Sequence, residues 1–435
     1  MGRDVAHEVV VNVLAAAALG ALAFVALGGR TEDIYLRLAG AEPPSTHVAV
    51  LAIDEESLYL WNPEESAPVV TPRGLLAELV DFLRVAEARV VVLDVLTDTS
   101  AEGDEALRAA ALAHGRVVAA ERFSSAGAHD PVPFAPATVL GTAVVAAFAN
   151  LGQEEATLFS GEMQVRAVPP VVAVARSLLS GRWPHNVVGG YSDDDQPVPA
   201  LALAAAYLAV NEGGAPELAR SLAAMCGGTP VQCHGELASL GLPARDGSLH
   251  EALPIYFRGP EGADGIPTIP ASRVLRLLAE RAVARSLGAE LPVSVPADLA
   301  ADLAGRVVLV GRVDGAAADK FVTPYSFPAM QEANMAGVRV HAHLVDRLLA
   351  GRHLRHVDGP PVWAGAALLA ALVLATSRRA GVGHLVAWGT AALATGAGGF
   401  FLFELYDGLL VDTGPLVGAV CVSMVAVHLY ARGKD

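Results

Sequence analysis

Two histidines and an aspartate stand within six positions of one another in the 435-residue chain. His341, His343 and Asp346 are residue types that bind metal ions through imidazole nitrogens and carboxylate oxygens. They lie in MAGVRVHAHLVDRLLAG, where the leucines recur at a helical period. On a helix, His341 and His343 point to different sides, because only side chains three or four positions apart share a face. We therefore predict a helix from His341 to Leu349 and no metal site.

Polar residues also follow several short apolar runs, at the point where each run ends. Asp54 follows VAVLAI, Asp94 follows RVVVL, and Arg312 follows RVVLVG. If these runs are parallel strands, their carboxyl ends meet at one edge of a sheet, where open α/β sheets bind ligands. Arg258 and Asp319 are the two further residues that we place in this ligand-binding crevice. The alternative is a structural polar network, in which the acids cap helices and Arg258 neutralises them.

The elements around these residues alternate between buried strands and amphipathic helices. Thr71 is a good N-cap and Pro72 suits the first helical position, while Asp104 opens a second helix that continues through Leu112. This alternation indicates a parallel sheet with helices on both faces. After about residue 135 the strands favour antiparallel pairing, so the sheet is expected to be mixed. These later strands read LGTAVVAAF, QVRAV and PIYFRG, and further helices are expected at Ala200 to Asn211 and at Ala271 to Ser286.

The composition points to a membrane protein. The formal net charge is -16, yet 53% of the residues are hydrophobic and the mean hydropathy is +0.44. A membrane protein with an acidic, water-exposed domain satisfies both values. The acidic balance argues against nucleic acid as a partner, because binding it requires a basic face. Cys226 and Cys233 lie close together in a loop, and their spacing allows either a disulfide or two free thiols.

Four apolar runs approach the length of about 20 residues that a helix needs to cross a bilayer. The first run has one polar residue and no clear cleavage site after it, which favours an uncleaved anchor over a signal peptide. The other three runs follow one another closely near the C-terminus. The expected spans are 9–28, 360–376, 383–405 and 409–430. The expected domains are an N-terminal anchor (1–29), a folded domain (30–357) and a three-span bundle with a short cytoplasmic tail (358–435).

The basic residues set the expected orientation. Arg378 and Arg379 join two of the spans, and Arg432 and Lys434 follow the last one, so both segments are expected in the cytoplasm. The connector around Asp407 carries no Lys or Arg, so it is expected on the extracytoplasmic side of the membrane. We therefore predict a multi-pass protein of the plasma (inner) membrane, with both termini in the cytoplasm and the large domain outside.

Several stretches of the sequence occur together in one order. They read VAVLAIDEESL, TPRGLLAELVDFLRVAEARVVVLDV, DEALRAA, IYFRGP, LAGRVVLVG, ADKFVTP and MAGVRVHAHLVDRLLAG. In this order and at these spacings they resemble the type-two CHASE domain (CHASE2), an extracytoplasmic sensory domain of bacterial signalling proteins. The resemblance covers most of residues 30–357. It implies an α/β sensor domain flanked by one span before and three after, whose closing helix with His341, His343 and Asp346 transmits a signal. The chain departs from the family at EEATLFSGEMQVRAV. Many members have an acidic D-x-D-G stretch followed by an arginine at this place, and here only the arginine, Arg166, is retained.

Family members usually continue into a cytoplasmic cyclase or kinase, whereas this sequence runs only to Asp435. We therefore predict a non-catalytic transmembrane sensor with an unknown extracytoplasmic ligand and a separate cytoplasmic or membrane signalling partner. No cofactor is expected, and the sequence contains no nucleophile elbow, phosphate loop or HExxH motif. The sequence does not decide whether the chain forms a homodimer. The alternatives are an envelope scaffold that binds cell-surface material and an extracytoplasmic metal-dependent enzyme.

Overall fold

The computed structural model describes most residues between 36 and 352 and a few beyond them. The described residues are 36, 38–62, 70–97, 99–121, 123–124, 132–133, 140–149, 152–155, 163–168, 171–175, 195–212, 214–225, 236–243, 253–262, 264–287, 295–315, 320–326, 334–352, 355–357, 364, 368, 398, 401 and 409–411. The chain divides into two compact units. They are 1–40 with 154–164 and 353–435, and 41–153 with 165–352. The second unit holds the central sheet and the candidate site.

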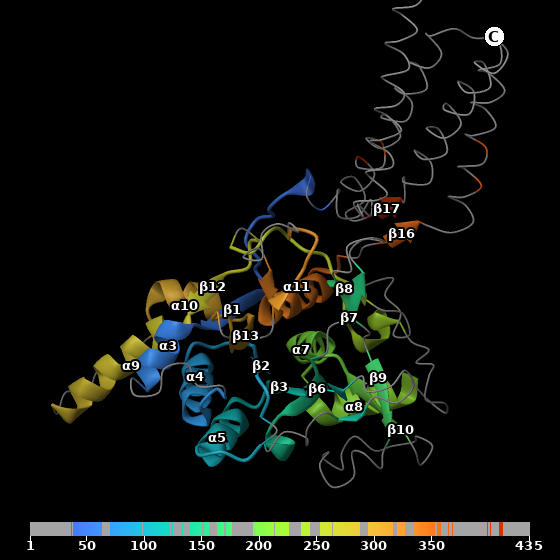
Figure 1. The fold of residues 1–435 in the computed structure, drawn as a ribbon. Coiled ribbons are helices and arrows are strands. Elements are labelled where there is room, and N and C mark those ends of the chain that lie inside the picture. The colour runs from blue at the N-terminus through green and yellow to red at the C-terminus, as the bar shows by residue number, and fades with distance from the viewer. Residues whose placement is uncertain are drawn as a thin grey trace, which may run out of the picture. The chain divides into compact units, whose positions relative to one another are not determined.

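Six parallel strands form the central sheet of the second unit (Figure 1). In order across the sheet they are β12 (Thr268–Pro270), β1 (Val48–Ile53), β13 (Val307–Arg312), β2 (Val90–Asp94), β3 (Val117–Glu121) and β6 (Val145–Phe148). The strands consist mainly of Val, Leu and Ala, and every residue of β1 is buried. Such continuous apolar runs are typical of parallel strands that are covered on both faces.

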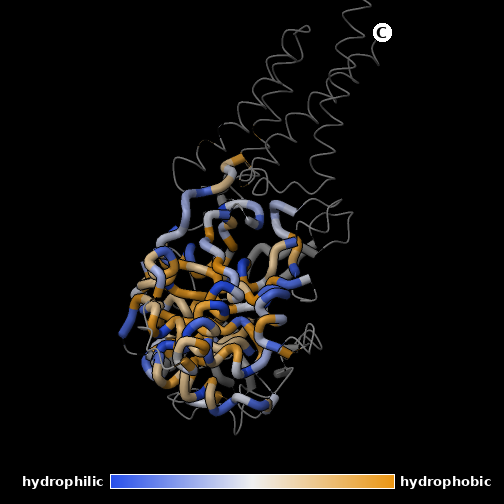
Figure 2. Tube along the Cα trace, turned by 90° about the vertical axis from the view of Figure 1, so that its left-hand side faces the viewer, coloured by the Kyte–Doolittle hydropathy of each residue, from blue (hydrophilic) through white to orange (hydrophobic). Residues whose placement is uncertain are grey.

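Helices cover both faces of the sheet and divide the core into two layers. On one face lie α3 (Glu55–Trp61), α4 (Arg73–Val85), α5 (Asp104–His114), α9 (Ala271–Ser286) and α10 (Ala297–Leu303); on the other lie α7 (Leu201–Val210) and α11 (Gly337–Ala350). Alternate side chains of β1 enter opposite layers, so that Leu51 packs with the first group and Val50 with the second. Figure 2 shows orange, apolar stretches running through this unit and blue, hydrophilic stretches on outer turns.

The start of α4 differs from the prediction by one residue. Pro72, not Thr71, occupies the N-cap position, and no side chain caps the helix. The Arg73 guanidinium lies 3.5 Å from the Thr71 carbonyl oxygen and 3.2 Å from that of Leu96, which holds Thr71 in the preceding loop. The predicted Thr71 cap is therefore wrong, although the helix itself is confirmed.

The pairing of the later strands was predicted only in part. The segment LGTAVVAAF forms a short 3-10 turn (Gly141–Ala143) and then β6, which pairs with β3 in parallel rather than antiparallel. QVRAV does pair antiparallel, since β8 (Met163–Val168) lies against β11 (Leu253–Pro254). The rest of PIYFRG is buried but forms no strand. An apolar run shows that a segment is buried, but it does not encode the direction of its partner strand.

The remaining described elements are short. In the second unit they are β4 (Phe123–Ser124) with β5 (Val132–Pro133), β9 (Val171–Ala175) with β10 (Asp195–Pro199), β14 (Lys320–Phe321) with β15 (Met335–Ala336), α8 (Gly214–Met225) and the 3-10 turn η3 (Leu237–Leu240); β7 (Gly152–Glu155) belongs to the sheet of β8. In the first unit β16 (Arg355–Val357) pairs in parallel with β17 (Leu409–Val411).

The expected spans fall almost wholly outside the described residues. The start of the fourth one forms β17 instead of a helix. Among the residues that the structure describes, none of the helices has both the length and the apolar character that crossing a bilayer requires.

Candidate functional site

The carboxyl ends of three neighbouring strands bring Asp54, Asp94 and Arg312 to one edge of the sheet. In the parallel registers, Ile53 of β1 lies opposite Arg312 of β13, and Gly311 of β13 lies opposite Asp94 of β2. Asp54 follows Ile53 directly. The parallel arrangement on which the prediction depended is present, and these three residues share the edge that we call the carboxyl edge.

Two of these three residues have partners within the domain. Asp54 caps α3, because its Oδ1 accepts a hydrogen bond from the Ser57 N–H at 2.8 Å and another from the Ser57 hydroxyl. The Arg312 guanidinium donates to both carboxylate oxygens of Asp314, at 2.8 Å from Nε and 2.5 Å from Nη2. Hydrogen bonding to Asp314 raises the pKa of Arg312. Asp54 therefore has the role that the structural alternative gave to the acids, and the charge of Arg312 is balanced by Asp314.

Asp94 differs from its neighbours on the carboxyl edge. Its carboxyl group forms no hydrogen bond or ion pair with any residue that the structure describes. Burial raises the pKa of Asp94 from 3.8 to about 7. A carboxyl group without a donor nearby favours its neutral form, because nothing offsets the loss of water. Perturbed groups of this kind occur often at functional sites. Asp94 is therefore the residue of this edge whose protonation a bound ligand could change most readily.

The chain leaves the neighbouring strands toward opposite faces of the sheet at this edge. β13 leads to α11 on one face, whereas β1 leads to α3 and β2 leads to α5 on the other. In open α/β sheets such a divergence makes room for ligands beyond the strand ends. Asp319, which was predicted to contribute here, lies outside the described residues.

Arg258 lies at the other end of β1. The backbone carbonyl of Arg258 accepts from the N–H of Glu42 at 2.9 Å, and its Nη2 donates to the Pro43 carbonyl. Glu42 and Pro43 precede β1, so Arg258 is on the amino side of the sheet. The structure therefore does not bring Arg258 together with Asp54 and Asp94, as the prediction of one crevice required.

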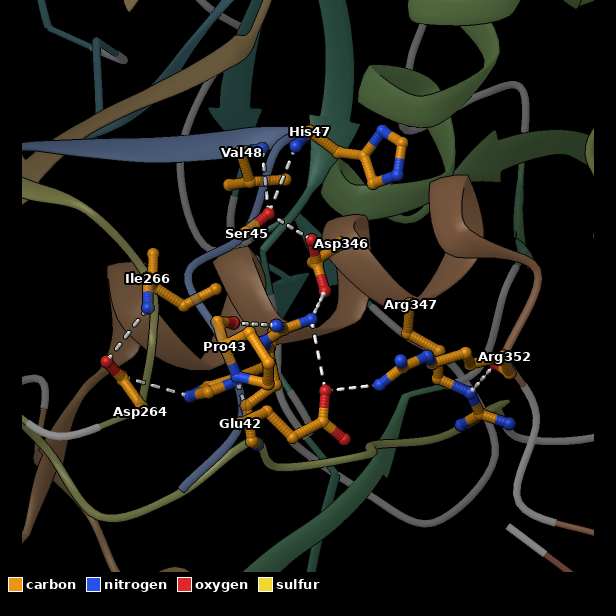
Figure 3. A network of polar contacts seen from close by, with 12 residues as sticks. Glu42, Pro43, Ser45, His47, Val48, Asp264, Ile266, Asp346, Arg347 and Arg352 are labelled. Carbon is orange, nitrogen blue, oxygen red and sulfur yellow. Dashed lines mark hydrogen bonds and ion pairs between the residues drawn. The ribbon is translucent and has the colours of Figure 1, made fainter. Parts of the chain in front are cut away.

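Arg258 belongs instead to a buried polar cluster along α11, which we call the α11 network. Figure 3 shows Glu42, Ser45, Asp264 and Asp346 of this network. Its members are Glu42, Ser45, Arg258, Asp264, Arg339, His343 and Asp346. Arg258 Nη1 donates to Asp346 Oδ2 at 2.7 Å and lies 3.3 Å from Glu42 Oε2. The Ser45 hydroxyl donates to the second Asp346 oxygen, and Figure 3 shows the two side chains pointing toward one another. Both oxygens of the Asp346 carboxylate are thus satisfied.

The second part of the α11 network surrounds Asp264. The Arg339 guanidinium donates to both of its oxygens, at 2.5 Å from Nη2 and 3.2 Å from Nε, and His343 Nε2 lies 3.2 Å from Oδ2. All three side chains are buried. Burial by itself would raise the pKa of Asp264, but the neighbouring His343 ring and the Arg339 guanidinium, which donates to both oxygens, lower it from 3.8 to about 2. Asp264 is therefore ionised over the whole physiological range of pH.

The two histidines of α11 point to different partners, as their spacing on a helix predicts. His343 Nδ1 accepts from the Arg258 N–H at 3.3 Å, which joins the two parts of the network. His341 Nε2 lies 3.2 Å from the Ala149 carbonyl oxygen, on a different side of the helix. In the portion of the chain that the structure describes, no group of three His, Cys, Asp or Glu side chains could hold a metal ion.

Sequence reasoning missed four residues of the network, namely Glu42, Ser45, Asp264 and Arg339. The helix begins at Gly337, earlier than the predicted start at His341. Arg339, His343 and Asp346 then stand at positions i, i+4 and i+7, which share one helix face. That periodicity could have identified Arg339. Asp264 lies in a loop, and no local pattern marks it.

A comparison with protein-family models gave a match that includes the central sheet and α11. The model of the CHASE2 domain matches residues 9–377, which is more than half of the sequence. The chain belongs to the CHASE2 domain family. CHASE2 is a sensory rather than a catalytic domain, and the resemblance found in the sequence is confirmed. No curated protein and no solved structure matches the sequence.

The match to the CHASE2 domain extends beyond the folded domain at both ends. It begins where the first expected span begins, and it includes the second one, 360–376. Cys226 and Cys233 lie outside the described residues, so their pairing stays open. The part of this CHASE2 domain that holds the carboxyl edge and the α11 network is described almost throughout.

Proposed function

We propose that this CHASE2 domain is the sensory head of a transmembrane signal receptor and that α11 is its output element. The path of α11 carries the proposal: the helix begins beside the carboxyl edge, crosses one face of the sheet and ends at Ala350. In the sequence, the next segment leads to the second expected span. The sensory character of the family supports this reading.

The carboxyl edge is in tight contact with the first turn of α11. A Cβ atom added to Gly311 would lie 2.7 Å from the Val338 Cβ, which is closer than two such carbons approach one another. Gly311 immediately precedes Arg312 and lies opposite Asp94. A ligand that moves the end of β13 must therefore move the start of α11. We propose Asp94, with Asp54 and Arg312 beside it on the carboxyl edge, as the place where the unknown ligand binds.

The α11 network restricts the positions that the helix can take. Every residue of α11 from Gly337 to Leu348 is buried, and three of them are charged or polar members of the network. A small displacement of the helix would separate Asp346 from Arg258 or Arg339 from Asp264, and unpaired buried charges are costly. Intermediate positions are thus disfavoured. A ligand can then select between two discrete arrangements through its different affinity for each.

The proposal places the domain outside the plasma (inner) membrane, with both termini in the cytoplasm. The lengths of the apolar runs and the positions of Arg378, Arg379, Arg432 and Lys434 support this topology. Protease added to intact spheroplasts should cut the chain near Tyr191 and leave a tag fused after Asp435 intact. Protection of the Tyr191 segment together with loss of the tag would reject this topology and the sensory role with it.

We propose further that the signal passes to a separate cytoplasmic partner of the cyclase or kinase type. The test is extraction of the full chain in mild detergent and identification of the signalling protein that accompanies it. Asp346→Asn should change the amount or activity of that protein severalfold, whereas Asp81→Asn, in an exposed ion pair, should not. Recovery of an envelope polymer without any signalling protein would favour the scaffold alternative.

A further inference from the structure

His343 lies at the centre of the α11 network, and its exposed fraction is 0%. Its ring packs against Phe257, with 5.4 Å between the ring centroids and 59° between the ring planes. The N–H of Arg258 donates to His343 Nδ1 at 3.3 Å, so Nδ1 is an acceptor and the ring proton is assigned to Nε2. This hydrogen bond therefore requires the neutral form of the imidazole.

A second proton on the His343 ring would abolish the contact with Arg258. The protonated imidazole donates from both nitrogens, so that Nδ1–H would face the N–H of Arg258. Two donors 3.3 Å apart repel one another, and the ring and the backbone must then separate. On the other side of the ring, Asp264 Oδ2 lies 3.2 Å from Nε2, but Arg339 already donates to both oxygens of this carboxylate. Asp264 therefore has little capacity left to compensate for the lost contact.

The charged groups around His343 do not balance a further positive charge. Among the residues that the structure describes, guanidinium groups outnumber carboxylates there by four to three. The guanidinium groups are those of Arg258, Arg339, Arg347 and Arg352, and the carboxylates are those of Glu42, Asp264 and Asp346. The other elements packed against α11 are α7, β1, β13 and β15, which contribute apolar side chains and the phenol of Tyr207 to the shared core. An imidazolium would thus be an uncompensated charge in a buried cluster, which is costly.

We propose that His343 is a pH-sensitive contact through which a proton selects between two arrangements of α11 and the segment 255–258. Imidazole side chains commonly change charge between pH 5 and pH 8. Acid favours the arrangement that binds the proton more tightly, which is the one where Nδ1 no longer faces the Arg258 N–H. Because the Arg258 side chain also pairs with Asp346, separation at His343 weakens a second attachment of α11. This inference goes beyond the proposed ligand site and does not depend on the receptor role.

Hydrogen exchange of the full chain in mild detergent, measured by mass spectrometry at pH 8 and pH 5, tests the proposal. The exchange rates, corrected for the direct chemical effect of pH, are compared for peptides that cover 253–262, α11 and α4. We expect at least tenfold faster exchange at pH 5 in 253–262 and α11, and no comparable change in α4 on the opposite face of the sheet. Equal rates at the two pH values, or the same acceleration in α4, would overturn the proposal.

The variant His343→Asn assigns the response to one side chain. The Asn side-chain oxygen can accept from the Arg258 N–H but takes up no proton, so exchange in 253–262 should stay slow at both pH values. Asp94 still titrates in this variant, which separates the two groups. The matched control is His47→Asn, since His47 is exposed beside the network (Figure 3), and it should respond like the unaltered chain.

A tenfold acceleration that persists in His343→Asn would reject His343 as the group that responds to pH. Should this variant not fold, the comparison of 253–262 with α4 in the unaltered chain still decides whether the acid response is confined to the α11 network. None of these results decides the receptor role, which the spheroplast and partner experiments test separately.

Discussion

The Arg258 guanidinium lies 2.7 Å from the Asp346 carboxylate, although the two residues are 88 positions apart in the chain. Arg258 belongs to the loop after β11, and Asp346 belongs to α11. The exposed fractions of the two side chains are only 8% and 3%. Such a pair adds little net stability when intact, but removal of one partner leaves a buried charge. The pair therefore fixes where α11 lies more than it raises the overall stability of the domain.

Replacement of Asp346 should destabilise the domain strongly. Asp346→Asn removes the closer of the two carboxylates beside the buried Arg258 guanidinium and leaves Glu42 at 3.3 Å, so we expect a loss of about 3 kcal/mol in the free energy of unfolding. Thermal unfolding of the purified full chain, followed by near-UV circular dichroism, measures the change. Each kcal/mol corresponds to a fall in Tm of roughly 2–4 °C for a domain of this size.

The control for this prediction is an exposed ion pair. Asp81 pairs with Arg84 on the surface of α4, and about half of each side chain is exposed. Asp81→Asn should change the free energy of unfolding by no more than about 0.5 kcal/mol. An equal loss in Asp346→Asn and Asp81→Asn would show that the buried pair does not hold α11 in place.

A methyl group at Gly311 should disturb the contact between β13 and α11. In Gly311→Ala the new Cβ would lie 2.7 Å from atoms of Val338, so the helix or the strand must shift. Overpacking of this kind costs typically about 1–3 kcal/mol, which urea unfolding measures. Gly315→Ala is the control, because its Cβ meets only Glu55 at 3.7 Å. Indistinguishable unfolding curves for the two variants would contradict the tight contact.

The raised pKa of Asp94 predicts that stability falls as the solution becomes less acidic. Unfolded Asp94 loses its proton near pH 3.8, whereas folded Asp94 keeps it until about pH 7. The free energy of unfolding therefore decreases between about pH 4 and pH 7. At about 1.4 kcal/mol per pH unit, the total is at most about 4 kcal/mol.

Calorimetry at pH 5 and pH 8 checks the Asp94 prediction. Asp94→Asn lacks the titrating group, so the decrease in Tm between these two values should be smaller than in the unaltered chain. The same decrease in both proteins would show that Asp94 is not the group responsible.

Asp264 predicts a second, separate pH effect of opposite sign. Its folded pKa of about 2 lies below the unfolded value of 3.8, so the stability that it contributes above pH 4 is lost as the pH falls toward 2. The difference corresponds to about 2 kcal/mol. Asp264→Asn should be less stable than the unaltered chain at pH 7 but should lose less stability between pH 4 and pH 2. Parallel losses, measured by acid titration of near-UV circular dichroism, would contradict this assignment.

The sequence predicted the parallel core well because its strands are buried on both faces. Runs such as VAVLAI and RVVVL can be satisfied only between two layers of helices, which fixes their type and their approximate bounds. The predicted antiparallel direction of β6 was wrong, because tertiary packing, and not the apolar pattern of the strand, decides how β6 pairs with β3. The cap of α4 was also misplaced, since the buried side chain of Arg73 determines the path of the loop before it.

The candidate site was predictable only where it follows from topology or helical periodicity. Asp54, Asp94 and Arg312 follow parallel strands, so their common edge could be deduced from the strand pattern alone. Arg258 follows an apolar run of the same appearance, but Ile255 to Phe257 form no strand, and Arg258 lies elsewhere. Its partners Glu42 and Asp346 are far from it in sequence, and no local pattern connects them.

The length of α11 separates the two ends of the domain. Fourteen helical residues extend for about 21 Å, from the tight packing at Gly311 to the turn at Gly351. If the carboxyl edge binds the stimulus as we propose, the binding groups and the end of α11 share no atoms. Under the same proposal, substitutions at the carboxyl edge should change which molecule is recognised without changing the end of α11, and sensory domains could be exchanged between receptors at a junction just after Gly351.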